Sequence, residues 1–386
     1  MFHILHLFTV ALIIYCIAVS LLLWKIPNCG KKTSGDRPAL GLKKKSGNET
    51  AKRLVSIIIP ARNEEKRLPR LLKSLHGEKQ RLPEQLHLEI IVVNDRSEDD
   101  TKQVAEDAGA RVLTLENAPE GRAGKSRACK RGAEAAKGDL FLFLDADTWF
   151  VPGGLLRVLE LQQPGLVSIQ PYHVTERFYE SFSAYFNIIV MSGVNAFTPF
   201  STEGKPKGCF GPCLLCSKED YFTAGGHGAI ETELVDDIAL ARLFVDRGLP
   251  VHCFGGRKCV EFRMYPAGMG DLTEGWTKNM ATGAKFSSLA TNILLFFWIA
   301  GVTNLFLSFL QAGASGRPLF LIGSAVVYIL YSLQLYLHLR RIGNFFPLLC
   351  LLFPVYLLFF ILLFMYSIVK TKFVKKVRWR GRDISL

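Results

Sequence analysis

Outside two short basic segments, this 386-residue chain has no net charge. The whole sequence carries a formal charge of +13, but residues 25–53 hold nine Lys or Arg residues against Asp36 and Glu49, a net +7. Residues 370–386 hold seven against Asp383, a net +6. A nucleic-acid-binding protein needs a basic stripe on its folded part, so we expect no nucleic-acid partner. Both basic segments adjoin apolar runs, which instead indicates contact with anionic membrane lipids.

Lys, Arg, Asp and Glu are absent from four apolar runs, each long enough to cross a bilayer of about 30 Å. The first run lacks a basic n-region and a small-residue cleavage site, so we predict a retained anchor and not a cleaved signal peptide. Pro347 and Pro354 interrupt the last run, which we therefore predict to be bent, with re-entrant or interfacial placement as the alternative to a full crossing. The runs are 1–24, 286–316, 318–339 and 342–369.

Positive charge next to apolar runs also predicts the topology. Basic segments tend to stay in the cytoplasm, so we expect a multi-pass protein of the cell membrane with a cytoplasmic catalytic domain. Three C-terminal crossings would place the basic tail on the other side, which favours two crossings or a re-entrant third. The predicted parts are an anchor, a basic tether, a catalytic domain, a C-terminal transmembrane region and a basic tail, at 1–24, 25–53, 54–285, 286–369 and 370–386.

The nine cysteines form no paired framework, and their number is odd. Cys209, Cys213 and Cys216 are spaced like metal ligands, but they lie in an apolar stretch and no second ligand pair matches them. We therefore expect no zinc site. The favoured interpretation is a set of reduced cytosolic thiols packed as small apolar side chains.

Strand and helix patterns alternate from residue 54 onward. Strands are predicted at 54–60, 88–93, 111–115 and 140–144, with helical patterns between them. This alternation is typical of an α/β domain with a mostly parallel sheet. Polar residues repeatedly follow the strand ends, where open α/β sheets bind ligands.

Asp145 and Asp147 follow the apolar strand at 140–144 and are the sharpest feature of the sequence. Carboxylate oxygens are hard ligands that suit Mg²⁺ or Mn²⁺. Such an ion bridges a diphosphate and neutralises a leaving group. The alternative is that Asp147 caps the N-terminus of a helix.

Four motifs in order strengthen the metal interpretation: VSIIIPARNEE at 55–65, VVNDRS at 92–97, GKS at 124–126 and DAD at 145–147. This series, over about residues 54–280, resembles glycosyltransferase family 2, inverting nucleotide-sugar enzymes with a GT-A fold. The resemblance implies a Rossmann-like, mostly parallel catalytic domain, here with one N-terminal and two to three C-terminal transmembrane helices.

The resemblance also implies a nucleotide-sugar site. Asp95 would hydrogen-bond the uracil of a UDP-sugar, and Lys125 would lie in the loop that closes on the diphosphate. Asp145 would face the ribose and Asp147 would hold the metal. The alternatives are an Asx-turn for Asp95 and solvated surface charge for Lys125 and Arg62. The residues implied to line the nucleotide pocket are Pro60, Ala61, Arg62 and Glu64. Asn94 and Arg96 depart from the family pattern, which usually has Asp and Gly there.

The segment ELVDDIALARL at 233–243 resembles the helix start that carries the general base in this family. Asp237 occupies the position of the base, which takes a proton from an acceptor hydroxyl. Asp236 is predicted to be a neighbour that raises the pKa of Asp237. The alternative for both is stabilisation of a helix N-terminus.

Three further residues are candidates on the acceptor side. His227 follows two glycines in a region that resembles the family's sugar-facing loop, with a structural histidine as the alternative. Trp276 and Lys278 lie where many relatives have Q-x-x-R-W, a clear departure. Trp276 would stack on acceptor or sugar, or else lie at the membrane interface. Lys278 would take over a diphosphate charge.

Aromatic residues recur at near-helical spacing over 178–197. We expect an amphipathic helix on the bilayer that feeds a lipid acceptor to the site. The alternative is a helix that faces the protein core.

A chain with its own anchor and several spans is expected to use a lipid-soluble acceptor. GWTKN at 275–279 and WRGR at 379–382 resemble bacterial carotenoid glucosyltransferases. This implies transfer of glucose from UDP-glucose to the carboxylate of a C30 carotenoid. Hopanoid and ceramide glucosyltransferases share these elements and remain alternatives, as does a non-enzymatic sugar-binding membrane scaffold.

Overall fold

The computed structural model describes residues 17, 18, 20–29, 52–116, 124–233, 235–283, 287–370, 376–379 and 382–385. The chain forms two compact units. The first, here called the sheet unit, comprises Pro27–His173 and Thr202–Met264. The second, the helical unit, comprises Met1–Ile26, Val174–Ser201 and Tyr265–Leu386. Most of the predicted anchor, the basic tether and much of the basic tail lie outside the described residues.

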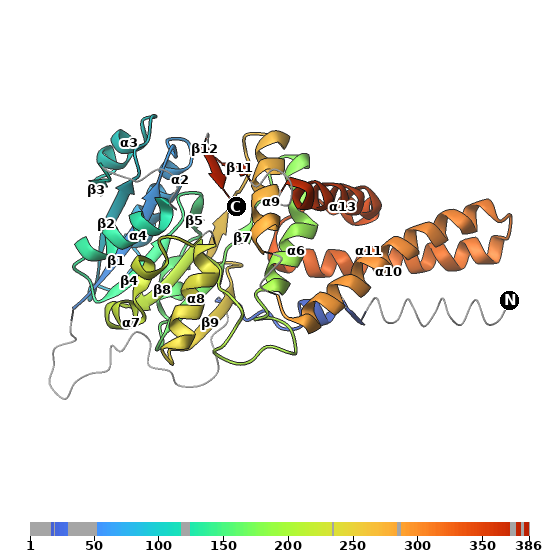
Figure 1. Ribbon diagram of the computed structural model, residues 1–386, viewed down its shortest axis with the longest axis horizontal. Helices are drawn as coiled ribbons and strands as arrows, with labels where there is room; N and C mark the ends of the chain where they lie inside the picture. Colours follow the sequence, from blue (N-terminus) through green and yellow to red (C-terminus); the bar gives the residue numbers. More distant parts are fainter. Residues whose placement is uncertain are drawn as a thin grey trace. The chain divides into compact units, whose positions relative to one another are not determined.

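The sheet unit is built on a seven-stranded sheet with the order β3-β2-β1-β4-β8-β6-β9 (Figure 1). β1 pairs in parallel with β2 and β4, while β8 runs antiparallel to β4 and β6. The predicted mostly parallel α/β fold is therefore confirmed. The strands are β1 Arg53–Ala61, β2 Leu86–Asn94, β3 Arg111–Thr114, β4 Leu140–Leu144, β6 Leu166–Gln170, β8 Cys213–Ser217 and β9 Val251–Gly255.

The central strands are apolar because both of their faces are covered by helices. All five residues of β4 are buried. On β1, Ile57 and Ile59 join the core that contains Leu68 and Leu72 of α2, whereas Ile58 points into the opposite core with Ala128 of α4. The helices of this unit are α2 Leu68–Lys79, α3 Thr101–Asp107, α4 Gly124–Ala135, α5 Gly154–Leu159, α7 Lys218–Ala224 and α8 Asp236–Asp246.

A second, three-stranded sheet has the order β5-β10-β7. β5 follows Asp147 directly, so the predicted aspartate pair lies between a strand of the large sheet and a strand of the small one. Its strands are β5 Thr148–Phe150, β7 Tyr172–His173 and β10 Val260–Phe262. Asp147 therefore begins no helix, and the helix-cap alternative for it is excluded.

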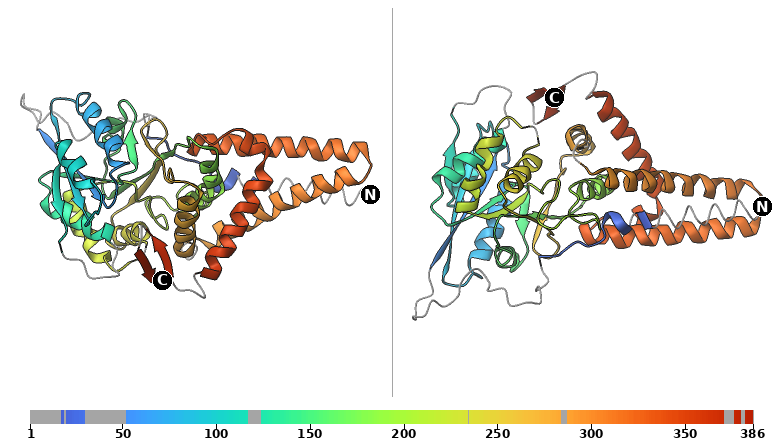
Figure 2. Two further views of the ribbon diagram at one scale, coloured as in Figure 1. Left: turned by 90° about the horizontal axis from the view of Figure 1, so that it is seen from above. Right: turned by 60° about the horizontal axis from the view of Figure 1, so that its bottom comes forward.

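In the helical unit, α10 (Leu289–Ala314) and α11 (Pro318–Ile342) are each long and apolar enough to cross a membrane. Figure 2 shows them running side by side. The last apolar run is divided into α12 (Leu348–Leu351) and α13 (Phe353–Val369). Pro347 and Pro354 lie at the two helix starts, where proline is tolerated, so the predicted break in this run is confirmed.

The aromatic segment 178–197 forms the short helix η2 (Phe178–Ser183) and α6 (Ala184–Gly193) within the helical unit. Tyr185 and Phe186 are buried, and so are apolar residues on the other sides of α6. A helix on a bilayer surface would leave one apolar face uncovered. The structure therefore supports the core-facing alternative, and the expected bilayer-surface helix is wrong. The segment also leaves the predicted 54–285 domain for the helical unit.

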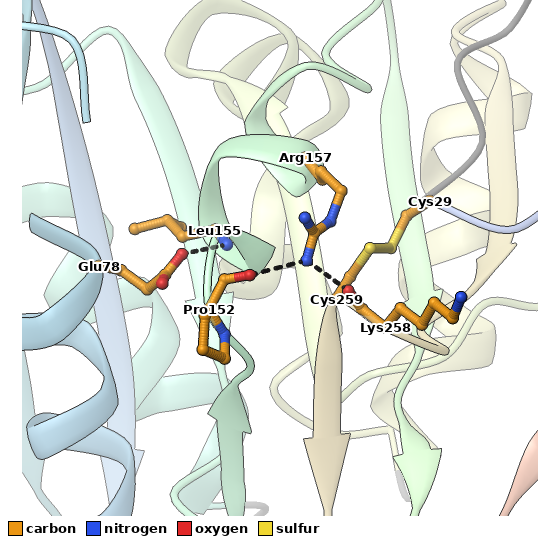
Figure 3. The surroundings of a disulfide bond; sticks show 7 residues. All are labelled: Cys29, Glu78, Pro152, Leu155, Arg157, Lys258 and Cys259. Carbon is orange, nitrogen blue, oxygen red and sulfur yellow. Dashed lines mark hydrogen bonds between the residues drawn. A yellow bond between two sulfur atoms is a disulfide. The ribbon is translucent and has the colours of Figure 1, made fainter. Parts of the chain in front are cut away.

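Cys29 and Cys259 form a disulfide in the sheet unit (Figure 3). The expectation that all thiols are reduced is therefore wrong for these two residues. Gly255, at the end of β9, accepts a hydrogen bond from the Cys29 amide and donates one to the Pro27 carbonyl. This backbone pairing brings Cys29 to Cys259 across 230 residues of sequence. The other cysteines of the described chain are free thiols, and all but Cys253 are buried, as expected for small apolar side chains.

Glu78, at the end of α2, supports the start of α5. Its buried carboxylate accepts hydrogen bonds from the Gly153 amide at 2.8 Å and the Leu155 amide at 2.9 Å (Figure 3 shows the second). Glu78→Ala leaves both amides without this acceptor, so we expect it to lower the free energy of unfolding by about 2–5 kcal/mol. Denaturant unfolding of the purified protein in detergent measures this loss. Glu84→Ala, at an exposed position, is the matched control, and equal destabilisation by both variants would contradict the assignment.

Candidate functional site

Three of the four predicted motifs lie at strand ends, and these three converge at one edge of the large sheet. β1, β2 and β4 are parallel neighbours, so their carboxyl ends lie on the same side. Pro60 pairs in register with Val93, and Ala61 with Asn94. Asp95 follows β2 and Asp145 follows β4. The residues that sequence motifs placed at separate strand ends are therefore brought to the carboxyl edge, where open α/β sheets bind ligands.

Asp95 is buried at this edge and is held by two arginines. The Asp95 Oδ1 atom lies 3.3 Å from Arg96 Nε, and Asp95 Oδ2 lies 3.9 Å from Arg62 Nη1. A Cβ atom on Gly124 would lie 2.0 Å from Asp95 Oδ2, so any other residue at the start of α4 would displace the Asp95 carboxylate. Arg62 is therefore more than solvated surface charge, because its guanidinium packs on a buried carboxylate.

The two departures from the family pattern have local structural explanations. Asn94 Oδ1 accepts a hydrogen bond from the Ser97 amide at 3.0 Å, the contact that an aspartate oxygen would make there. Asn94, and not Asp95, thus makes the side-chain to backbone hydrogen bond of this turn. Arg96 has a φ of 53°, in the left-handed region that favours glycine. The arginine at this position is strained, and its side chain contacts Asp95.

Ala61 and Glu64 are buried next to the edge. Ala61 belongs to the core between the sheet and α2. The Glu64 amide donates to Thr101 Oγ1 at 2.7 Å, and Arg67 Nη1 lies 3.4 Å from Glu64 Oε2. These contacts fix the loop between β1 and α2, which carries Arg62.

A small cleft in the sheet unit brings together several of the predicted site residues. Its lining contains Pro60, Lys125, Asp145, His227, Asp236 and Asp237, all predicted from the sequence. Sequence reasoning did not assign the other lining residues to the site: Cys129, Phe143, Leu144, Gly211, Leu214 and Leu240. Cys129 lies one helical turn after Lys125, and Leu240 lies three residues after Asp237, so helical spacing was the signal available.

Lys125 and Asp145 form the closest ion pair in the cleft. Lys125 Nζ lies 2.7 Å from Asp145 Oδ1 and 2.9 Å from Asp145 Oδ2. Burial favours the neutral amine, but the charges of Asp145 and Asp236 outweigh burial and raise the pKa of Lys125 above its ordinary value. Lys125 is therefore a permanent cation in this cleft.

Asp237 is a half-buried carboxyl group near the start of α8. Burial, with the charge of neighbouring Asp236, raises the pKa of Asp237 to about 7, while Lys125 acts in the opposite direction. Asp237 Oδ1 accepts a hydrogen bond from the Ile238 amide, and the Cys209 thiol donates to the Asp237 carbonyl. The group is thus poised to gain or lose a proton near neutral pH, as an acid–base residue requires.

The structure does not bring Trp276 and Lys278 into this cleft. Both lie on α9 (Met269–Gly283) in the helical unit. The Trp276 ring is buried, stacks on Phe186 at 4.9 Å between centroids, and donates from Nε1 to Ser183 Oγ at 2.9 Å. Its aromatic surface is thus engaged within the unit, which is a core role.

The aspartate pair fits a metal of the kind expected from the sequence. Asp147 is half-buried, and its carbonyl accepts from the Arg263 amide. No group of three His, Cys, Asp or Glu side chains that would enclose an ion occurs in the described part of the chain. Mg²⁺ is commonly held by one or two carboxylates plus substrate phosphates, without a full protein cage. Asp147 would supply a carboxylate of this kind, while both carboxylate oxygens of Asp145 contact Lys125.

Comparisons with known proteins agree with these motifs. The family model described as Glycosyl transferase family 2 matches residues 56–221. A 4,4'-diaponeurosporenoate glycosyltransferase of Staphylococcus aureus (strain USA300) is 38% identical over 369 residues, covering 93% of this chain and 94% of that protein. A protein of the same name from strain MRSA252 is 39% identical over 370 residues, with the same coverage.

Solved structures are more distant. A mannosyltransferase from Pyrobaculum calidifontis, in complex with GDP-Man and Mn²⁺, aligns with 95% of this chain and 96% of its own at 16% identity, with a TM-score of 0.49. Glucosyl-3-phosphoglycerate synthase from Mycobacterium tuberculosis, in complex with Mn²⁺ and UDP, aligns with 60% of this chain and 78% of its own at 24% identity, with a TM-score of 0.37.

The positive charge of Lys125 stabilises the ionised form of Asp237 and so lowers the pKa of Asp237. Removing this charge should therefore raise that pKa. We expect Lys125→Met to raise the pKa of Asp237 above its value of about 7. Infrared titration of the protonated carboxyl band, with Asp237→Asn as the blank, measures this change. Lys130→Met is the matched control on the same helix, because Lys130 pairs with Glu231 instead. An unchanged or lowered pKa would contradict the proposed electrostatic coupling.

Proposed function

The chain belongs to glycosyltransferase family 2, and from this premise we propose that it transfers glucose from UDP-glucose, with inversion, to the carboxylate of a membrane-dissolved C30 carotenoid. The observation that carries the transfer is that a single cleft is lined by Asp145 at one strand end and by Asp237 at a helix start. The acceptor class is supported by 38% identity, along nearly the whole chain, to a 4,4'-diaponeurosporenoate glycosyltransferase.

The donor is held by the carboxyl edge of the sheet in this proposal. Asp95 accepts a hydrogen bond from the uracil, while Pro60, Ala61, Arg62 and Glu64 shape the loop beside it. Lys125 adds a fixed positive charge next to Asp145, where the ribose and diphosphate lie. Mg²⁺ or Mn²⁺ held by Asp147, when bound, neutralises charge on the departing diphosphate.

The acceptor side depends on the chemistry of the attacking oxygen. A carotenoid carboxyl group with a pKa near that of Glu, about 4.3, is already ionised at neutral pH and needs no base to attack the sugar. A hydroxyl acceptor would instead need Asp237 to remove its proton. Asp237 is therefore the acceptor-side carboxyl group in either case. Its ionised form suits a hydroxyl acceptor, which needs a base, and its neutral form suits a carboxylate acceptor, which needs none.

A membrane location is part of the proposal. α10 and α11 have the length and apolarity to cross a bilayer. We propose a multi-pass protein of the cell membrane, in contact with membrane lipids, with the sheet unit in the cytoplasm where nucleotide sugars are made. The lipid-soluble acceptor then reaches the enzyme from the bilayer.

Two substitutions separate a carboxylate acceptor from a hydroxyl acceptor. With a carboxylate acceptor, we expect Asp147→Ala to lower kcat/KM at least about 10³-fold, and Asp237→Asn to lower it by less than about 10-fold. Glucosyl transfer from UDP-glucose to the purified C30 carotenoic acid, followed by mass spectrometry, measures both rates. Near-total loss in both variants would argue against a carboxylate acceptor.

The pH dependence gives a second test. The pKa of Asp237 is raised to about 7, so it changes from neutral to anionic as the pH rises through neutrality. An anionic Asp237 repels an incoming carboxylate, so we expect kcat/KM to fall between about pH 6 and about pH 8. Asp237→Asn should be flat over this range. A rate that instead rises with pH would indicate a hydroxyl acceptor that requires the ionised base.

A further inference from the structure

Two glycines after α7 shape the start of the short 3-10 helix η3 (Gly226–Ile230), which carries His227. Gly225 and Gly226 have φ values of 98° and 53°. A Cβ atom on Gly226 would lie 2.5 Å from two ring atoms of Tyr221, so the backbone passes flat against that ring only as glycine. This approach places the His227 amide 3.0 Å from Tyr221 Oη, to which it donates a hydrogen bond.

The same tyrosine oxygen fixes the state of the imidazole. Tyr221 Oη lies 3.1 Å from His227 Nδ1. Oη accepts from the His227 amide. We assign its own proton, which would otherwise be buried without an acceptor, to the bond with Nδ1. Burial raises the pKa of Tyr221 and lowers the pKa of His227 to about 4, so at neutral pH the phenol keeps its proton and the imidazole is uncharged. A neutral imidazole that accepts at Nδ1 carries its proton on Nε2.

His227 lines the same cleft as Asp145 and Asp237, the carboxyl groups assigned to donor and acceptor. The residue is only 2% exposed, its ring packs against Phe143 with centroids 4.9 Å apart, and Nδ1 is engaged by Tyr221. Since Nδ1 is engaged, we infer that the ring edge with Nε2 is the part of His227 that lines the cleft, together with Asp145 and Asp237. In a transfer reaction the sugar lies between the nucleotide and the acceptor, so the proposed function puts it next to these residues.

We propose that His227 is a specificity-determining residue, whose Nε2–H donates a hydrogen bond to a hydroxyl group of the transferred hexose. Tyr221 is the positioning residue that holds the required tautomer. The inference rests on the proposed function, because it needs a nucleotide sugar in the cleft. A fixed, uncharged donor suits a neutral sugar hydroxyl, and a site built to bind a hydroxyl discriminates strongly against sugars that misplace it.

Binding of UDP and UDP-glucose to the full-length protein in detergent with Mg²⁺ tests the proposal. UDP lacks the sugar, so we expect His227→Phe to leave the Kd for UDP within about 2-fold and to weaken UDP-glucose binding about 10-fold. His227→Gln, which keeps an N–H donor, should restore part of this loss. The preference in kcat/KM for UDP-glucose over UDP-galactose should fall in His227→Phe. His87→Phe, at an exposed position on β2, is the matched control and should change nothing.

Tyr221→Phe tests the positioning role. We expect about 3-fold weaker UDP-glucose binding and, in histidine labelled with ¹⁵N, a shift of the His227 signals from the Nε2–H tautomer toward a mixture. Equal weakening of UDP and UDP-glucose in the His227 variants would overturn the inference, because it indicates a purely structural histidine. An unchanged sugar preference would also overturn it, while wild-type turnover of UDP-glucose leaves the proposed function standing. A wild-type protein that turns over no nucleotide sugar would overturn both.

Discussion

The contact between Lys125 and Asp145 governs the electrostatics of the whole cleft. It joins the first turn of α4 to the end of β4, with Nζ 2.7 Å and 2.9 Å from the two carboxylate oxygens. The same charge acts on Asp237, lowering a pKa that burial and Asp236 raise. One amine thus balances carboxyl groups from two separate elements, and without it the cleft would hold acidic groups at close range with no cation on its wall.

Glycines allow this concentration of charge to exist. Gly124 is packed against the Asp95 carboxylate, and Gly226 against the Tyr221 ring. A Cβ atom on Gly211 would lie 3.3 Å from Lys125 Nζ and 3.4 Å from Asp237 Cβ, so this glycine keeps the space between the cation and the acid open. At each place the absence of a side chain lets a polar group approach the backbone, which is how ligand sites are commonly built.

The two units differ in the kind of surface that they provide. The sheet unit supplies a rigid edge on which charged side chains are fixed by short contacts. The helical unit contains α10 and α11, whose exposed Leu, Ile and Phe side chains suit a lipid environment. Trp276 illustrates the difference, because its burial against Phe186 and Ser183 makes it part of the core of the helical unit. The Cys29–Cys259 disulfide adds a covalent link between the start of the basic tether and the strand region of the sheet unit.

The sequence alone determined the order of strands and helices from residue 53 to 144, the break near Pro347 and Pro354, and the motifs at the strand ends. These follow from local periodicity, from proline geometry and from the rule that parallel strands end at one edge. It also identified six of the residues that line the cleft. Their side chains suit nucleotide-sugar chemistry, and they occur along the chain in the same order as the motifs of this family.

Only the tertiary structure decided which of these residues meet. Trp276 and Lys278 lie where many relatives have the motif Q-x-x-R-W, but they are not among the residues that line the cleft. The aromatic segment 178–197 packs in the core of the helical unit and not on a surface. Cys29 and Cys259 are paired across 230 residues. The tautomer of His227 depends on a tyrosine that a glycine turn brings within 3.1 Å. Local sequence sets what a segment can form, but burial and long-range contacts depend on the rest of the chain, and no local pattern encodes them.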